Sequence, residues 1–120
     1  MMFSFENLGV NQKARVLVKE VYNLQNKLPA EERYALGDQI RRSITSVTSN
    51  IAEGSGRDSN KDKAHFCVIA FESLMEAFSQ LQNAQDLGYI SINEVESLRP
   101  QFEEISKMLS GLKSSFEKKL

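Results

Sequence analysis

The stretch Gln39–Arg57, QIRRSITSVTSNIAEGSGR, contains a helix and the place where that helix ends. Apolar side chains recur along it at the spacing of one helix face, at Ile40, Ile44, Val47 and Ile51. A stripe of this kind is typical of a helix that buries one side. Because the stripe stops at Ile51, we expect Gly54 to end the helix in the left-handed conformation that glycine adopts without strain. Gly56 then lets the chain reverse, so the stretch predicts a helix followed by a tight turn.

Three further segments carry an apolar stripe at the same spacing. The stripes are Val10, Ala14, Leu17, Val21, Leu24 and Leu28; Cys67, Ala70, Leu74, Ala77, Leu81 and Ala84; and Val95, Leu98, Phe102, Ile105, Leu109, Leu112 and Phe116. Pro29 is well placed to open the second helix, Ser59 to cap the third, and Gly88 to end it. Ser91 and Glu94 have the spacing of a capping box for the fourth helix.

No segment alternates apolar and polar residues in the way that a half-buried strand does. Four amphipathic helices with short connections are best accommodated as an antiparallel bundle. The sequence therefore predicts an all-α, up-down-up-down four-helix bundle in which residues 1–120 form a single domain.

Composition excludes several classes of protein. Of the 120 residues 41% are hydrophobic and 26% are charged, and the net charge of −1 gives no overall attraction to nucleic acid or membrane. No apolar run is long enough to cross a bilayer, and the first residues lack the pattern of a secretory signal. One cysteine, Cys67, and one histidine, His65, build neither an internal disulfide nor a metal cluster. We expect a cytoplasmic protein without metal or cofactor.

Motifs for phosphate binding and catalysis are incomplete. The glycines at 54 and 56 lack the lysine and hydroxyl of G-x-x-x-x-G-K-S/T, and a helix rather than a strand precedes them. Arg57 and His65 do not have the spacing of helical ribonuclease toxins, and no E-x-x-H pair is present for a di-metal site. Cys67 lies on a core stripe, which favours an inert thiol. We therefore predict that the chain is not an enzyme and has no small-molecule substrate.

Two features indicate an interface with another protein surface. On the face of the second helix opposite its apolar stripe lie Arg42, Ser46 and Glu53, flanked by Ser49 and Asn50. A charged outer face is often only solvated, but short serine side chains beside charges also permit close approach of a partner. In the third helix Val68 and Ile69 lie off the core stripe, so apolar residues cover nearly its whole circumference. A helix of this kind is buried on more than one side, which predicts a homo-oligomer.

The same residues carry a family resemblance. The matching positions are Gln39–Ser43, Ser46, Asn50–Gly54, Gly56–Arg57, Phe66, Ala70, Ser73–Leu74, Glu76, Gln80–Leu81 and Leu87–Ile90, with Asn7–Leu8, Ala14, Leu17 and Val21–Tyr22 before them. This pattern resembles the four-helix bundle proteins encoded in intervening sequences of bacterial 23S rRNA genes. Two positions depart from it, since Glu72 stands where glycine is common and Ser55 where an aromatic residue is common.

The resemblance implies a bundle that assembles as a homopentamer, most of whose relatives have no established activity. It also implies kinship with the accessory proteins of diversity-generating retroelements, which work with a reverse transcriptase and nucleic acid. A polar network at a subunit boundary would then consist of Arg42, Ser46, Asn50, Glu53, Arg57 and Glu76.

Two functional hypotheses follow. In the first, the chain is an oligomeric adaptor that binds RNA or DNA, such as ribosomal RNA or nucleic acid held by a reverse transcriptase. The basic residues that would make the contact are Lys13, Arg15, Lys19, Arg41 and Arg42. In the second, the chain is a protein–protein interaction scaffold that does not touch nucleic acid, and the absence of interleaved basic and aromatic residues in the sequence favours it.

Overall fold

The computed structural model describes residues 2–120, which contain four α-helices, two short 3-10 helices and no strand. The α-helices are α1 (Gly9–Gln25), α2 (Leu36–Ser55), α3 (Asn60–Asp86) and α4 (Ile92–Glu117), and the 3-10 helices are η1 (Ser4–Asn7) and η2 (Ala30–Glu32). The all-α prediction and the number of helices are confirmed.

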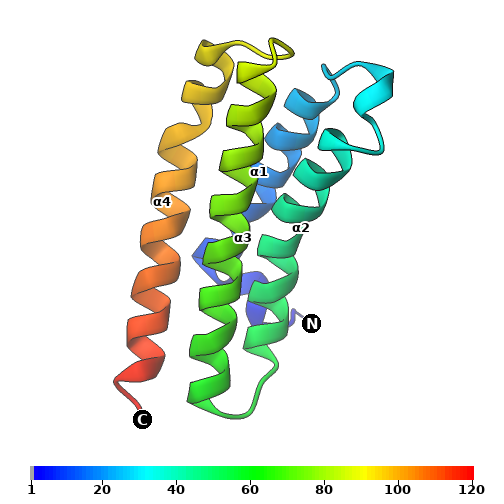
Figure 1. Cartoon of the computed structure of the whole chain (residues 1–120). Coiled ribbons are helices and arrows are strands. Elements are labelled where there is room, and N and C mark those ends of the chain that lie inside the picture. The colour runs from blue at the N-terminus through cyan, green and yellow to red at the C-terminus, as the bar shows by residue number, and fades with distance from the viewer. Residues whose placement is uncertain (1) are drawn as a thin grey trace.

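The four α-helices lie side by side along the long axis of a particle that measures 46 × 24 × 23 Å (Figure 1). Each α-helix packs against its neighbours in the chain, and α1 also packs against α4. In Figure 1 the α1–α2 and α3–α4 connections lie at one end of the particle, and the turn between α2 and α3 lies at the other. The end with the α2–α3 turn also holds the last turn of α4, so two segments that are distant in the sequence lie at the same end.

The predicted stripes meet in one hydrophobic core, except that Leu28 and Leu112 are only half-buried against it and that Cys67 and Phe116 lie outside it. Leu17, Ile40, Leu74 and Leu81 have no exposed surface, and Ile105 is 1% exposed. Burying a side chain of this size stabilises the folded chain by about 1.5–3 kcal/mol, so these stripes supply most of the driving force for folding. Their agreement with the predicted positions explains why the helices were recognisable from the sequence.

Polar contacts tie the edge where α1 meets α4. The Lys13 ammonium is 3.0 Å from the Glu104 carboxylate, Gln101 donates a hydrogen bond to Glu20, and Lys27 pairs with Glu94. The Lys27 contact, with hydrogen bonds from Ser91, lowers the pKa of Glu94 to about 2. Open surface grooves of about 280 Å³ and about 330 Å³ lie along this edge. The outer side of the α1–α4 contact is therefore polar, while its inner side belongs to the hydrophobic core.

Most of the predicted helix ends are confirmed. The Ser59 hydroxyl accepts a hydrogen bond from the Asp62 backbone N–H, and Ser91 and Glu94 form both bonds of a capping box. Gly88 has a φ of +82°, as expected for the residue that follows a helix. The predicted start of the second helix is wrong, because η2 follows Pro29 and α2 begins only after Ala35 leaves the helical conformation.

The predicted role of Gly54 is also wrong, because α2 continues through it to Ser55 and Gly56 follows with a φ of −89°. Gly88 is the one residue of 2–120 with a positive φ. What requires a glycine at 54 is proximity, since a Cβ there would lie 2.8 Å from the Cβ of Phe66 on α3. The absence of a side chain allows α2 and α3 to approach each other closely at this point.

We expect Gly54→Ala to lower the free energy of unfolding by about 1–3 kcal/mol, the range seen when extra methyl groups are forced into packed interiors. Urea denaturation followed by circular dichroism measures the change. Gly111→Ala is the matched control, because nothing lies within 4 Å of a Cβ at that position in α4. That variant is expected to gain about 0.4–1 kcal/mol. Equal effects of the two substitutions would contradict the close approach at Gly54.

Candidate functional site

Part of the predicted polar stripe on α2 is used inside the chain. The hydroxyl oxygens of Ser46 on α2 and Ser73 on α3 are 2.8 Å apart. The Asn50 side-chain N–H₂ donates to the Ser46 hydroxyl at 2.9 Å and to the Ser46 carbonyl at 2.7 Å. Since Ser73 is 8% exposed, this cluster satisfies polar groups at the α2–α3 packing seam. Short side chains are needed here because the two helices are close together.

The charged members of the same prediction lie outside this cluster and form no ion pair with one another. Arg42 is exposed and donates to the Asp38 carboxylate at 2.8 Å. The guanidinium carbon of Arg57 lies 4.5 Å from the centre of the Phe66 ring. Glu53 and Glu76 are exposed and pair with no cation among residues 2–120. A single chain therefore does not join the six residues into one network.

The two apolar residues predicted at an interface, Val68 and Ile69, are both half-buried in the isolated chain. Adjacent residues of a helix point about 100° apart, so they belong to different strips of the α3 surface. Val68 lines a groove of about 220 Å³ that also includes Phe71 of α3 and Leu109 of α4. Met75, one turn beyond Phe71, is 40% exposed. The outer side of α3 thus carries apolar surface that the bundle itself does not cover.

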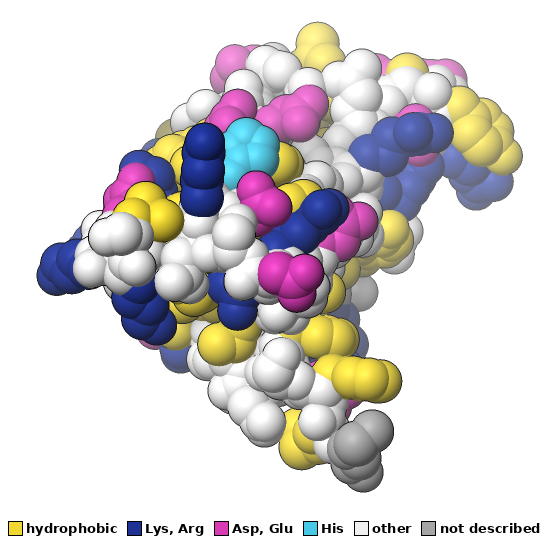
Figure 2. Space-filling model, turned by 90° about the horizontal axis from the view of Figure 1, so that it is seen from below, with side chains coloured by type: hydrophobic (Ala, Val, Ile, Leu, Met, Phe, Trp, Pro, Cys, Tyr) yellow, Lys and Arg dark blue, Asp and Glu magenta, His cyan; other side chains and the backbone are white. Residues whose placement is uncertain are grey.

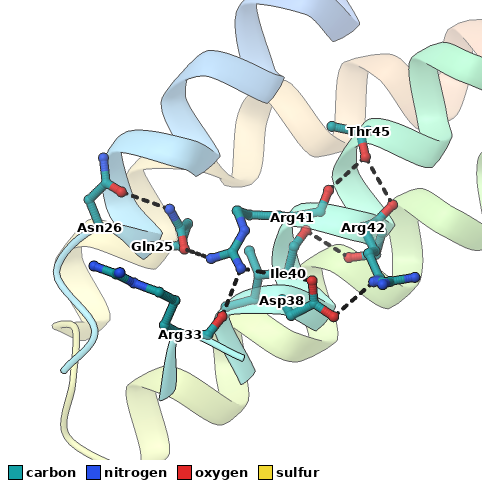
Figure 3. A network of polar contacts seen from close by, with 9 residues as sticks. Gln25, Asn26, Arg33, Asp38, Ile40, Arg41, Arg42 and Thr45 are labelled. Atoms are coloured by element: carbon teal, nitrogen blue, oxygen red, sulfur yellow. Dashed lines mark hydrogen bonds and ion pairs between the residues drawn. The ribbon is translucent and has the colours of Figure 1, made fainter. Parts of the chain in front are cut away.

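Arg41 differs from the other predicted basic residues because its hydrogen bonds link separate segments of the chain. Its guanidinium donates to the Gln25 side chain at 2.8 Å and to the Arg33 carbonyl at 2.7 Å (Figure 3). Its Nη2 lies 3.8 Å from Asp38, and 23% of the side chain is exposed. These contacts join the end of α1, the connection after it and α2. A guanidinium committed in this way has few donors left for a ligand.

The remaining basic residues divide into paired and unpaired cations. Lys13 pairs with Glu104, and Arg42 pairs with Asp38. Arg15 and Lys19 on α1 are exposed and form no ion pair with residues 2–120. Of the predicted basic set, Arg15 and Lys19 are the residues whose charge is not already matched by a carboxylate within the chain.

A second group of unpaired cations gathers at the end of the bundle that carries the α2–α3 turn. Figure 2 looks onto this end and shows Lys and Arg side chains around hydrophobic and neutral surface, with some Asp and Glu side chains among them. Of the cations there, those that form no ion pair among residues 2–120 are Arg57, Lys61, Lys63, Lys118 and Lys119. Sequence reasoning missed this group, because its members come from two stretches separated by more than half of the third helix and the whole of the fourth.

Aromatic rings lie among these cations and line a cavity of about 160 Å³. Phe66 comes from the start of α3 and Phe116 from the last turn of α4. Lys63 and Lys119 place their ammonium groups 5.7 and 5.6 Å from the centre of the Phe116 ring. Interleaved basic and aromatic side chains, which the sequence alone did not show, are therefore present in the folded chain.

Metal ligation, the Cys67 thiol and the hydropathy of the helices are further features of residues 2–120. No group of three His, Cys, Asp or Glu side chains there is placed to hold a metal ion. Cys67 is buried, and that burial raises the pKa of its thiol, with a smaller opposing effect of Lys113. Within the same residues, none of the helices has both the length and the apolar character needed to cross a membrane.

Two neighbouring arginines test the distinction between a cation that is bonded within the chain and one that is exposed. We expect Arg41→Met to lower the free energy of unfolding by about 1.5–3 kcal/mol, because it removes charged hydrogen bonds to Gln25 and Arg33. Arg42→Met is the matched control and should change it by about 0.5 kcal/mol or less, since its pair with Asp38 is exposed. Urea denaturation measures both, and an Arg42 effect as large as that of Arg41 would contradict the assignment.

Comparison with known proteins places the chain in a family. A crystal structure of a protein with unknown function from the S23 ribosomal protein family, from Bacteroides thetaiotaomicron, matches with a TM-score of 0.79 and 27% sequence identity. The match covers 88% of this chain and 95% of that one. No curated protein sequence matches. The family model described as 23S rRNA-intervening sequence protein matches residues 6–111, which confirms the resemblance seen in the sequence: the chain belongs to that family.

Proposed function

We propose that the chain is a non-enzymatic scaffold or adaptor that works in the cytoplasm as a homo-oligomer of antiparallel up-down-up-down bundles. The observation that carries this proposal is the uncovered apolar surface of α3, where Val68 and Ile69 are half-buried and Met75 is 40% exposed. Apolar surface at the side of a helix is stabilised when a second copy covers it. The family resemblance supports five copies.

Charges on the neighbouring surface of α2 and α3 are suited to such a contact. Arg42 is 80% exposed, and its one carboxylate partner is Asp38 of the same helix. Glu53 and Glu76 are exposed carboxylates without a cation among residues 2–120. In an oligomer the arginine of one copy and a glutamate of the next would become the polar rim around a buried apolar centre. The predicted network would then form between chains.

Assembly is tested by sedimentation equilibrium of the wild type and of Ile69→Asp. We expect the wild type to sediment as an oligomer and the variant as a monomer, because a carboxylate at a buried contact loses its hydration without a partner. Val16→Asp is the matched control, since Val16 is 55% exposed on α1, away from α3. A monomeric wild type, or an Ile69→Asp variant that remains assembled and folded, would contradict the proposed interface.

We further propose that the assembled protein binds RNA or DNA, as expected of an adaptor beside ribosomal RNA or a reverse transcriptase. Arg15 and Lys19 support this, because their charges are not matched within the chain. Several copies of a weak basic patch bind a long polyanion more strongly than one copy does. The alternative is a protein scaffold that does not contact nucleic acid. The ion pairs of Lys13 and Arg42 and the network around Arg41 favour that alternative.

Fluorescence anisotropy with labelled RNA and DNA across a salt series separates the two functions. We expect affinity to fall steeply with salt, because binding releases counterions from the phosphates. The double variant Arg15→Ala, Lys19→Ala should reduce that salt dependence, whereas the control Arg33→Ala, Lys107→Ala should not. No binding at low salt, or binding that does not respond to salt, would leave the protein scaffold as the function.

A further inference from the structure

We propose that the cavity lined by Phe66 and Phe116 receives an unpaired base of a single-stranded nucleic acid, with Arg57, Lys63 and Lys119 contacting the phosphates beside it. The proposal rests on the nucleic-acid part of the proposed function and names the form of nucleic acid and the place where it is held. It concerns the end of the bundle, away from the predicted basic residues of α1 and α2.

The cavity is built where four segments meet. η1 supplies Ser4, α2 supplies Asn50 and Ile51, and α3 and α4 supply the two phenylalanines. Its volume of about 160 Å³ is roughly ten times what one water molecule requires. Apolar and aromatic groups dominate the lining, while Asn50, Ser55 and Lys63 add polar groups. A planar ring with apolar faces and a polar edge matches this lining.

The cations around the cavity favour a ligand that carries negative charge. Arg57 lies 4.5 Å from the Phe66 ring centre, and Lys63 and Lys119 lie within 6 Å of the Phe116 ring centre. None of the three forms an ion pair with residues 2–120. The nearby ammonium of Lys113 is already paired with Glu117 at 3.5 Å. Three unpaired cations therefore lie at the two aromatic rings, and some Asp and Glu side chains share this end of the bundle (Figure 2).

A nucleotide strand combines the two properties that this site complements. Proteins that bind single strands without sequence preference place aromatic rings for the bases within a positively charged groove that follows the phosphates. In a duplex the base faces are stacked on one another and are not free to enter a cavity. A free mononucleotide has the same base and phosphate chemistry, so the experiment must distinguish it from a strand.

The test is fluorescence anisotropy with fluorescein-labelled oligouridylate, which has little structure of its own. We expect Phe116→Leu to weaken binding about tenfold, because it removes one stacking ring and retains apolar volume. Phe3→Leu is the matched control, since Phe3 is 62% exposed in the N-terminal segment and does not line the cavity. It should leave the affinity unchanged. Equal affinity of Phe116→Leu, Phe3→Leu and the wild type would overturn the proposal.

A second variant keeps both rings and removes charge. Lys63→Gln, Lys119→Gln should lower the slope of log affinity against log salt by about 1.4, as expected for two phosphate contacts on a single strand. A slope equal to that of the wild type would overturn the phosphate contacts. Because neither lysine is buried, this variant tests the site even where the phenylalanine substitution affects folding.

Two further experiments, one of direct binding and one of competition, assign the ligand. An oligouridylate annealed to oligoadenylate is expected to bind more weakly than the free strand, and equal binding would overturn the requirement for unpaired bases. Uridine monophosphate is expected to displace the strand only poorly, and equally effective displacement would reassign the site to free nucleotides.

The binding experiments distinguish failure of this proposal from failure of the proposed function. Absence of binding by the wild type at low salt would remove the nucleic-acid function itself. Binding that is lost in Arg15→Ala, Lys19→Ala and retained in Phe116→Leu would keep that function and move the contact to α1.

Discussion

The close approach of α2 and α3 at Gly54 is the constraint on which much of the molecule depends. A Cβ at that position would be 2.8 Å from the Cβ of Phe66, so the absence of a side chain allows the two helices to approach this closely at that point. The same proximity brings the hydroxyls of Ser46 and Ser73 to 2.8 Å and places the Phe66 ring beneath Arg57. One missing side chain therefore determines both the seam between the helices and the shape of the cavity at the end of the bundle.

The sequence predicts those parts of the fold that depend on short-range patterns. Helix stripes such as Ile40, Ile44 and Val47 repeat every three or four residues, and the capping box needs only Ser91 and Glu94. Spacing of this kind is fixed by the geometry of the helix and requires no knowledge of its neighbours. The local pattern predicts the wrong role for Gly54, because that role depends on Phe66 of another helix. A glycine near the end of a stripe has the same local sequence pattern whether it ends the helix or allows a neighbouring helix to approach closely.

The candidate site was predicted less well than the fold, because charge has little meaning until its partners are known. Arg41 and Arg42 are adjacent and identical in type, yet one is held by Gln25 and Arg33 while the other is exposed. Likewise Lys63 and Lys119 are far apart in the chain, and only the fold places both at Phe116. The apolar stripes predicted the four-helix architecture, whereas the distribution of paired and unpaired cations required the structure.

The polar edge between α1 and α4 affects the order in which parts of the bundle unfold locally. Exposed ion pairs such as that of Lys13 with Glu104 contribute little stability, and α1 contacts α4 less extensively than α2 contacts α3. Regions with these features exchange their amide hydrogens through local openings that cost less than complete unfolding. The first helix would thus separate from the fourth before the α2–α3 hairpin loosens, and protection against deuterium should be greatest on either side of the Ser46–Ser73 contact.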